Sequence, residues 1–450
     1  MKLLDTLFPG SKEYGNVSTG KIWALGFQHV LAMACATIMV PLVTGLDVSV
    51  TLFSVGIGTL LFHIITKGKV PAFLGSSSTF IAAICLIMAN PSFGATSRER
   101  AAAAMGGIIF VGIIYVIVSF IIRVSGTNFI EKLIPPLVRG VAVALIGLNL
   151  AGIAIKNIQA NNGFELYSSG YVWCWCIALF VLILAMYLSA YGKGMAKMIS
   201  IFIALVSGYA VTFIFVKTGL APQGLMDFEG LAAQGRGLAR ALIEMPKLTF
   251  PVFNGRAIAM IAPLAIVSCV EHIGDIYAIS AVAEKNFAKD PGLHRTILGD
   301  GLATALAGAI GAPSNTTYSE NTAILATTGN FNPASIRAAA VITIGISFFG
   351  KAVGVIETMP SCVLGGICIL LYGMIASVGL RTLVDSKVDF TKNRNLSIAA
   401  VMLVLSLGGA VIGGPDFSLT GISLGIISGI ILNSVLPGKT ADDKNDKSFM

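Results

Sequence analysis

The chain has 450 residues, of which 55% are hydrophobic and only 12% are charged, and its mean hydropathy is +0.85. Water-soluble domains carry about 25% charged residues, so this composition excludes a set of soluble domains. The apolar runs have the length of membrane-crossing helices, about 20 residues, and not that of the alternating strands of a β-barrel. The sequence therefore predicts an all-α integral membrane protein.

Fourteen apolar segments follow one another, bounded by charged residues or by clusters of proline and glycine. Most are long enough to cross a hydrocarbon core of about 30 Å. Segments 3 and 10 contain VPAFLGSSSTF (70–80) and GAPSNTTYSEN (311–321), which predict short extended stretches because such residues make poor lipid-facing helix. The fourteen segments are 21–45, 48–66, 70–90, 102–122, 133–155, 171–190, 197–216, 257–282, 296–311, 314–329, 336–356, 359–380, 396–413 and 419–436.

An even number of crossings places both termini on one side of the membrane. With the tails 1–20 and 438–450 in the cytoplasm, 21 of the 30 basic residues face the cytoplasm, as the positive-inside rule requires. This distribution accounts for the net charge of +8 without a nucleic-acid partner. We therefore expect a multi-pass protein of the bacterial cytoplasmic (inner) membrane.

The seven cysteines all lie within apolar runs and are predicted to be small hydrophobic residues. Cys174 and Cys176 are separated by one residue, which is not the CxxC spacing of a metal or redox site. No metal site and no cofactor are expected.

Two halves of seven segments share sequence features at matching distances, which predicts a 7+7 inverted repeat. His29 precedes Pro71 by 42 residues, and His272 precedes Pro313 by 41 residues. IPPLVRGVAVAL (134–145) aligns without gaps with MPSCVLGGICIL (359–370). The two irregular stretches should then meet near the middle of the membrane and form a substrate site, or else remain re-entrant loops without a ligand.

Four of the 22 acidic residues lie inside predicted membrane segments: Glu271, Asp275, Asp300 and Glu320. Charged groups at membrane depth are unfavourable, so these residues are candidates for function. Glu271 and Asp275 are four residues apart and share one helix face. Glu320 lies near the start of the half-helix expected after the second extended stretch. Asp300, between two glycines close to the cytoplasmic end of segment 9, is expected to cap or pack a helix.

The predicted site combines carboxylate acceptors, backbone N–H donors at broken helices and the hydroxyls of 76–79 and 314–319. No Lys or Arg is expected deep in a segment, so an anionic substrate would lack a counter-charge. A neutral planar heterocycle with N–H donors and C=O acceptors fits better. Because desolvation penalises a charged carboxylate, such a group can bind and release a proton, as proton-coupled transport requires. His29 and His272 are expected to hydrogen-bond to neighbouring helices.

Three motifs, VEHIGD (270–275), DPGLHRTILGDGLATALAG (290–308) and NTTYSEN (315–321), resemble the nucleobase–ascorbate transporter (nucleobase–cation symporter-2) family, and its uracil permease branch in particular. VPAFLGSS (70–77) and DSKVDF (385–390) extend the match over nearly the whole chain. The resemblance implies proton symport of a nucleobase, elevator-type alternating access and a homodimer.

The resemblance also implies two domains, each built from both halves of the chain. The core domain would comprise 21–122 (segments 1–4) and 256–357 (segments 8–11). The gate domain would comprise 133–217 (segments 5–7) and 359–437 (segments 12–14).

By this resemblance, Glu271 and Glu320 accept hydrogen bonds from the ring N–H groups of the substrate. The backbone near Ser78 and Ser319 donates to the ring carbonyls, and Tyr318 shapes the site.

Proton coupling is assigned to Glu271, Asp275 and Glu320. Asp275 stands where the uracil permease pattern has His, Ser78 where it has Phe and Ser319 where it has Gly. Uracil is therefore the favoured substrate, with xanthine or another base as the alternative.

Two other classes of protein fit the sequence less well. An anion exchanger of the same 7+7 architecture predicts a basic residue at the half-helix junction, which the sequence lacks. A membrane enzyme is disfavoured because no nucleophile–base pair, metal-ligand cluster or phosphate-binding glycine motif is present.

Overall fold

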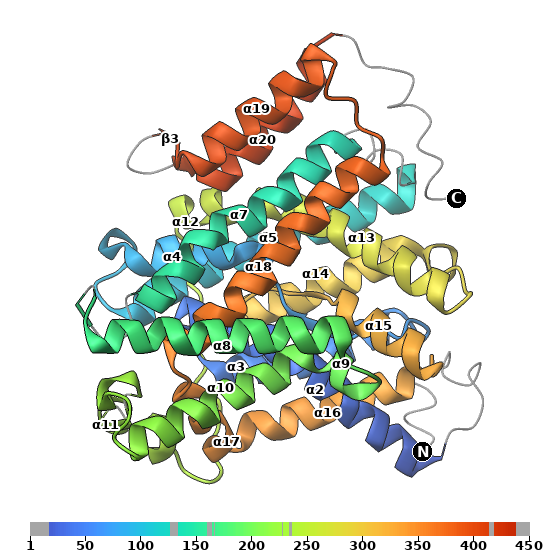
Figure 1. Cartoon of the computed structure of the whole chain (residues 1–450). Helices are drawn as coiled ribbons and strands as arrows, with labels where there is room; N and C mark the ends of the chain where they lie inside the picture. Colours follow the sequence, from blue (N-terminus) through green and yellow to red (C-terminus); the bar gives the residue numbers. More distant parts are fainter. Residues whose placement is uncertain are drawn as a thin grey trace.

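The computed structural model describes residues 18–126, 134–159, 164–165, 167–226, 228–233, 236–413 and 418–437. Within these ranges the chain is mostly helical, with four very short strands (Figure 1). The predicted tail 438–450 and residues 1–17 of the N-terminal tail lie outside the described residues.

The elements of the first half, where η marks a short helical turn, are α2 (Thr19–Thr44), α3 (Val48–Ile65), β1 (Leu74–Ser76), η2 (Ser78–Phe80), α4 (Ile81–Ala89), η3 (Pro91–Phe93), α5 (Ser97–Ser125), α7 (Pro136–Gln159), α8 (Ser169–Tyr191), α9 (Met195–Met198) and α10 (Ser200–Lys217). Those of the second half are η5 (Gln223–Leu225), α11 (Phe228–Ala233), η6 (Gly237–Ala239), α12 (Gly255–Ile261), α13 (Leu264–Val282), η7 (Ala288–Gly292), α14 (Leu293–Ile310), β2 (Asn315–Thr317), α15 (Ser319–Thr328), α16 (Pro333–Phe348), α17 (Gly350–Glu357), α18 (Ser361–Asp385), α19 (Asn393–Leu407), β3 (Val411–Gly413), β4 (Ser418–Thr420) and α20 (Gly421–Val435).

Eight helical stretches of the described chain are long and apolar enough to cross a membrane: α2, α3, α5, α7, α8, α10, α12 with α13, and α18. The bent pair α16 and α17 would make a ninth. α4 and α15 are only 9 and 10 residues long, and α19 and α20 have 15 residues each. The number of fourteen crossings therefore stays a prediction.

The predicted segment 11, 336–356, is not one straight helix in the structure. α16 ends at Phe348, and α17 leaves it at an angle of 81°. The loop before α12 satisfies the backbone at the break, because Glu244 N donates to Phe348 O and Gly350 N donates to Leu242 O, both at 3.0 Å. The loop thus replaces the hydrogen bonds that a continuous helix would have made.

A buried network of charged groups holds this loop against α17. Arg240 donates through Nη2 to Glu357 Oε1 at 2.8 Å and through Nε to Glu357 Oε2 at 2.9 Å. Arg240 also pairs with Asp47 at 3.4 Å and with Glu244 at 3.3 Å, and Arg236 pairs with Glu357 at 3.1 Å. The connection between α10 and α12 is therefore fixed to the start of α3 and the end of α17.

The long helices pack in two groups. In one group α14 packs on α5 and α3, and α16 packs on α3 and α2. In the other α18 packs on α7 and α8, α8 on α10, and α19 on α20 and α7. Each group draws helices from both halves of the chain.

α7 and α18 cross in a manner that relates the two halves by an approximate twofold axis. In the alignment of 134–145 with 359–370, equivalent residues are 225 positions apart. A Cβ added at Gly140 would meet Leu383 and the carbonyl of Gly379, and one added at Gly365 would meet Ile158 and the carbonyl of Ala154. Leu383 and Gly379 are the equivalents of Ile158 and Ala154. Each repeat therefore makes the same contact with the other repeat, as a twofold axis requires.

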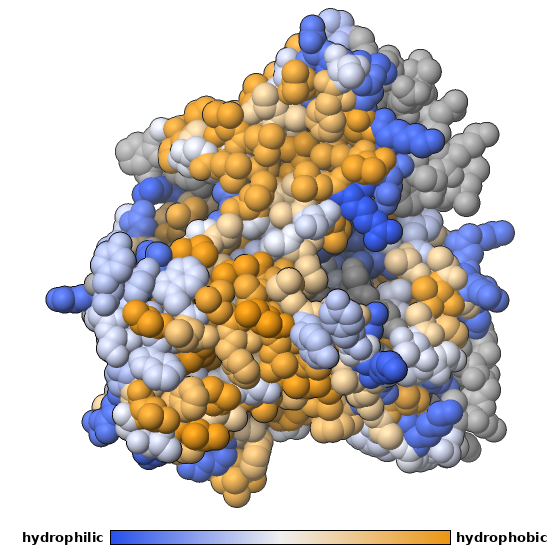
Figure 2. Space-filling view, in the orientation of Figure 1, coloured by the Kyte–Doolittle hydropathy of each residue, from blue (hydrophilic) through white to orange (hydrophobic). Residues whose placement is uncertain are grey.

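In Figure 2 apolar residues form a continuous area over the α19–α20 hairpin and lie among more polar ones in the region of α8. On α8 the exposed residues include Val172, Leu179, Phe180, Ile183 and Met186. Exposed apolar surface of this extent fits a face that contacts lipid.

Candidate functional site

Two short strands from opposite halves of the chain meet inside the helical body. β1 and β2 pair antiparallel, with Leu74 opposite Thr317 and Ser76 opposite Asn315. A further bond joins Ser77 N to Ser314 O at 2.8 Å. After β1 the chain enters η2 and α4, and after β2 it enters α15 directly. The starts of two short helices therefore lie beside the paired strands, where backbone N–H groups are oriented to donate.

Buried polar side chains satisfy the irregular backbone around the strands. Asn315 Nδ2 donates to Ser54 O at 3.3 Å and to Ala303 O at 3.4 Å, which connects β2 to α3 and α14. Thr59 Oγ1 accepts from Leu74 N at 3.1 Å, and Asn321 Nδ2 donates to Pro71 O at 2.7 Å. Non-helical backbone at membrane depth requires such internal partners.

Tyr318 packs flat against β1. Its hydroxyl donates to Ser76 O at 2.8 Å, and its side chain is buried. A Cβ added at Gly75 would lie 2.2 Å from two ring atoms of Tyr318, so only glycine fits at this position. The ring is thus held by β1 at the entrance to α15.

Glu271 lies on α13 and is joined to the start of the first half-helix. Thr79 Oγ1 in η2 donates to Glu271 Oε2 at 3.2 Å. Glu271 belongs to the exposed residues, and a Cβ added at Gly274, one turn further along α13, would meet nothing within 4 Å. Ser78, next to Thr79, is half-buried. The structure therefore brings Glu271 and Ser78 to the same place and leaves space beside this face of α13.

Asp275 is connected to the second strand. Thr317 Oγ1 in β2 donates to Asp275 Oδ2 at 2.8 Å, and both side chains are buried. Glu271 and Asp275 thus contact η2 and the end of β2 respectively, one turn apart on α13. The sequence indicated hydroxyls at 76–79 and 314–319, but did not indicate that Thr79 and Thr317 would be the ones that contact the carboxylates.

Asp300 does not cap a helix, so that part of its predicted role is wrong. α14 begins at Leu293, before the predicted start of segment 9, and this places Asp300 two turns into the helix and fully buried. His272 Nδ1 lies 3.0 Å from Asp300 Oδ2 and 3.3 Å from Thr317 Oγ1. Asp300 and His272 therefore link α14 to α13, as helix-packing residues do, directly behind Asp275.

Glu320 and Ser319 are the first two residues of α15, so the predicted position of Glu320 near the start of this half-helix is confirmed for the backbone. Their side chains lie outside the described residues. The roles predicted for them stay predictions.

One basic residue of a predicted segment is partly buried in the protein. Arg337 lies in the second turn of α16, with a half-buried side chain whose Nη1 atom is fully buried. That no Lys or Arg lies deep in a segment stays a prediction. The place of Arg337 in the sequence, four residues after Pro333, suggested a helix end at the membrane surface.

The described residues contain no group of three or more His, Cys, Asp or Glu side chains placed to hold a metal ion. The site offers carboxylates, hydroxyls and backbone N–H groups, which bind a polar organic molecule by hydrogen bonds.

The fold and this site define a multi-pass membrane transporter. A family model described as "Permease family" matches residues 20–413. The chain belongs to this family, the nucleobase–ascorbate transporters, as its motifs indicated. The members are permeases, which confirms that the protein is a transporter and not an enzyme.

Curated relatives align over nearly the full chain. The uracil permease of Bacillus caldolyticus is 39% identical over 431 residues, which are 95% of either chain. The uracil permease of Bacillus subtilis is also 39% identical over 431 residues, 94% of either chain. The probable uracil permease of Haemophilus influenzae is 38% identical over 413 residues, covering 92% of this chain and 94% of the relative.

Solved structures of similar fold belong to other transporters. The transmembrane domain of the cyanobacterial bicarbonate transporter BicA aligns with a TM-score of 0.63 at 14% identity, covering 92% of this chain and 97% of that chain. SLC26A9 aligns with a TM-score of 0.67 at 13% identity, covering 96% of this chain and 68% of that chain. These similarities show the fold, which is that of the 7+7 transporters.

Proposed function

We propose that the protein imports uracil together with a proton across the bacterial cytoplasmic membrane. The observation that carries the proposal is the contact between Glu271 and Thr79, which holds a carboxylate beside the start of a half-helix. A carboxylate accepts from a ring N–H, and free backbone N–H groups donate to a ring carbonyl. Uracil presents both groups on one edge. The uracil permeases among the relatives support the same substrate.

Proton coupling is assigned to Glu271, Asp275 and Glu320. Asp275 is buried behind Glu271 and accepts from Thr317 at 2.8 Å, so both half-helix regions contact a carboxylate of α13. A proton on one of these groups changes which hydrogen bonds the substrate can make. Binding of the proton and binding of the base are then linked.

Alternating access is assigned to movement of a core domain against a gate domain. The separate packing of α2, α3, α5, α14 and α16 on one side, and of α7, α8, α18, α19 and α20 on the other, supports this division. Cytoplasmic termini and a homodimer belong to the same proposal.

Uptake of radiolabelled uracil into cells, with and without a proton uncoupler, tests the proposal. We expect uptake that the uncoupler abolishes, and uptake that Glu271→Gln and Glu320→Gln abolish without loss of expression. Glu229→Gln, an exposed residue of α11, is the matched control and should transport normally. Uptake insensitive to the uncoupler would contradict proton coupling, and wild-type uptake by Glu271→Gln would contradict the site.

Xanthine is the second candidate, because Ser78, Asp275 and Ser319 depart from the uracil permease pattern. Competition of unlabelled nucleobases against labelled uracil distinguishes the two. Inhibition by xanthine at lower concentration than by unlabelled uracil would favour the purine.

A further inference from the structure

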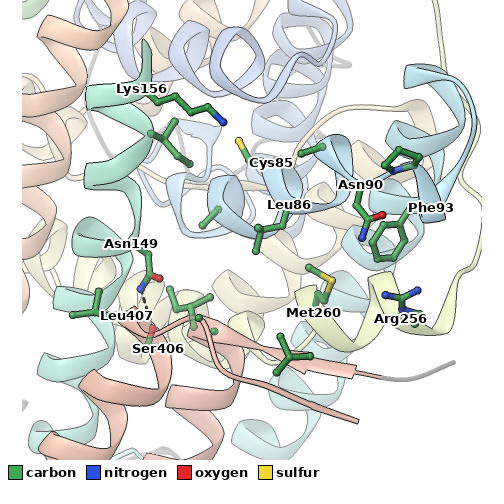
Figure 3. A pocket seen from close by; sticks show the side chains of 18 residues that line it. Cys85, Leu86, Asn90, Phe93, Asn149, Lys156, Arg256, Met260, Ser406 and Leu407 are labelled. Carbon is green, nitrogen blue, oxygen red and sulfur yellow. Dashed lines mark hydrogen bonds between the residues drawn. The ribbon is translucent and has the colours of Figure 1, made fainter. Parts of the chain in front are cut away.

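A cavity of about 740 Å³ lies where α4 and α12, which pack on α5, face α7, α19 and α20 (Figure 3). α4, η3 and α12 form one wall, and α7, α19, β3 and α20 form the other. Pockets of this size bind small organic molecules. Neither Glu271 nor Asp275 is among the residues that line it.

The charged residues that line the cavity are both basic. Lys156 lies in the last turn of α7, and its ammonium end points toward Cys85 on α4 (Figure 3). Arg256, at the start of α12, lies with its guanidinium 5.1 Å from the centroid of the Phe93 ring. Its Nη1 donates to Ser92 Oγ at 3.4 Å. Both charged residues among the described lining of the cavity therefore attract an anion.

Between the two basic groups the wall is mostly apolar, with Leu86, Met260 and Leu407 among its residues. Asn149 adds a fixed polar group, because its Nδ2 donates to Ser406 Oγ at 2.9 Å and to Leu145 O at 2.8 Å. Figure 3 shows Lys156 and Arg256 at different ends of the cavity. An apolar surface with a cation toward either end suits a flat ring that carries acceptor oxygens on opposite edges.

We propose that this cavity is a second ligand site, which binds a planar anionic heterocycle such as a carboxylated pyrimidine. The ring would lie on the apolar wall, with a carboxylate near one basic side chain and a ring carbonyl near the other. The preference for an anion rests on the cavity alone. The choice of a pyrimidine ring rests on the proposed function.

Orotate, which is uracil with a carboxylate at C6, is the probe, and uracil is its neutral counterpart. The purified full-length protein in nanodiscs of phosphatidylcholine is titrated with each by calorimetry. We expect Lys156→Gln and Arg256→Gln each to weaken orotate binding about fivefold, since each removes one attractive charge. Arg256→Lys should retain most of the affinity.

Lys217→Gln and Arg98→Gln are matched controls, because they remove the same charges from residues outside the cavity lining. Both should bind orotate as the wild type does. Glu271→Gln should weaken uracil binding and leave orotate binding unchanged. Orotate binding that responds to Glu271→Gln but not to Lys156→Gln would overturn the second site. Binding of orotate but not of uracil by the wild-type protein would count against the proposed function and not against the cavity.

Cys85 provides a second readout, because it lines the cavity and is half-buried. The labelling uses a variant in which the exposed Cys176 is replaced by Ala. The described cysteines other than Cys85 and Cys176 are buried. A negatively charged methanethiosulfonate should then label Cys85 faster than a positively charged one, and orotate should slow the labelling. Lys156→Gln should reduce the difference between the reagents. Equal rates in the wild type, or labelling that orotate does not slow, would contradict the proposal.

The same titration in nanodiscs with added phosphatidylglycerol distinguishes a soluble anion from a lipid headgroup. We expect the same orotate affinity in both membranes. Loss of orotate binding in the anionic membrane would assign the cavity to lipid and overturn the proposal.

Discussion

Gly147 of α7 lies against the backbone carbonyl of Tyr372 of α18, and these two residues are equivalent positions of the two repeats, 225 residues apart. A residue can contact its own equivalent only where the symmetry axis passes between them. The approximate twofold axis of the molecule therefore runs through the crossing of α7 and α18. The glycine at this position lets the two helices approach closely.

Gly147→Ala should destabilise the protein, because its Cβ would lie 2.4 Å from Tyr372 O and 2.5 Å from Ala376 N. Overpacking of this kind costs about 1–3 kcal/mol. Gly152→Ala in the same helix is the control, since its Cβ meets nothing within 4 Å. Thermal unfolding in detergent should show a lower Tm for the first variant and an unchanged or higher Tm for the second. Equal Tm values for the two variants would mean that α7 and α18 accommodate the added methyl group without loss of stability.

Gly75→Ala should displace the Tyr318 ring, which a Cβ at this position would approach to 2.2 Å. We expect uracil uptake to fall at least about tenfold, since a small misplacement in a binding site has effects of this size. Gly345→Ala, with open space around its Cβ, should transport normally. Initial uptake rates normalised to expression make the comparison. A Gly75→Ala protein with normal uptake would show that Tyr318 does not need its present position.

The buried pair of His272 and Asp300 should be strongly coupled. Replacing one partner leaves the other buried without its ion-pair partner, with a loss of about 3 kcal/mol. We expect His272→Gln and Asp300→Asn each to lower the free energy of unfolding, and the double variant to lose less than the sum of the two. Denaturant unfolding of all four proteins gives the coupling energy. Additive losses would mean that the 3.0 Å contact contributes no stability.

The loop before α12 should lose stability in acid. A hydrogen bond from Lys247, followed by the charge of Arg240, holds the pKa of the Glu244 carboxyl below its usual value of 4.5. A lowered pKa contributes stability at neutral pH, and this contribution disappears as the pH falls below about 4.5. The Tm difference between wild type and Glu244→Gln should therefore shrink between pH 6 and pH 3. A Tm difference that stays constant between pH 6 and pH 3 would show that the folded protein does not favour the ionised form of Glu244.

The sequence was most informative where the composition changes abruptly. Glycine, serine and threonine within otherwise apolar runs predicted the irregular stretches 70–80 and 311–321, and β1 and β2 lie within them. The position of Glu320 at the start of a half-helix followed from the same signal. A polar interruption can be recognised because a lipid-facing helix would not contain it.

Contacts between distant parts of the chain could not be predicted in this way. Asp300 seemed to lie near a helix end because hydropathy placed the start of segment 9 at 296, whereas α14 begins three residues earlier. The break at Phe349 depends on hydrogen bonds from the loop at 242–244, more than 100 residues away. The contacts of Thr79 and Thr317 with the carboxylates of α13 likewise require the tertiary fold.

The pairing of β1 with β2 restricts how this transporter can open. Leu74, Gly75 and Ser76 come from the first repeat, and their partners Asn315, Thr316 and Thr317 come from the second. A clamshell motion that separates the N-terminal half of the chain from the C-terminal half would have to break these backbone bonds in a medium without water to replace them. A sliding motion of one mixed group of helices against the other leaves them intact. The paired strands therefore hold the two repeats together. The interface at which the transporter opens must lie between the two mixed groups of helices and not between the two repeats.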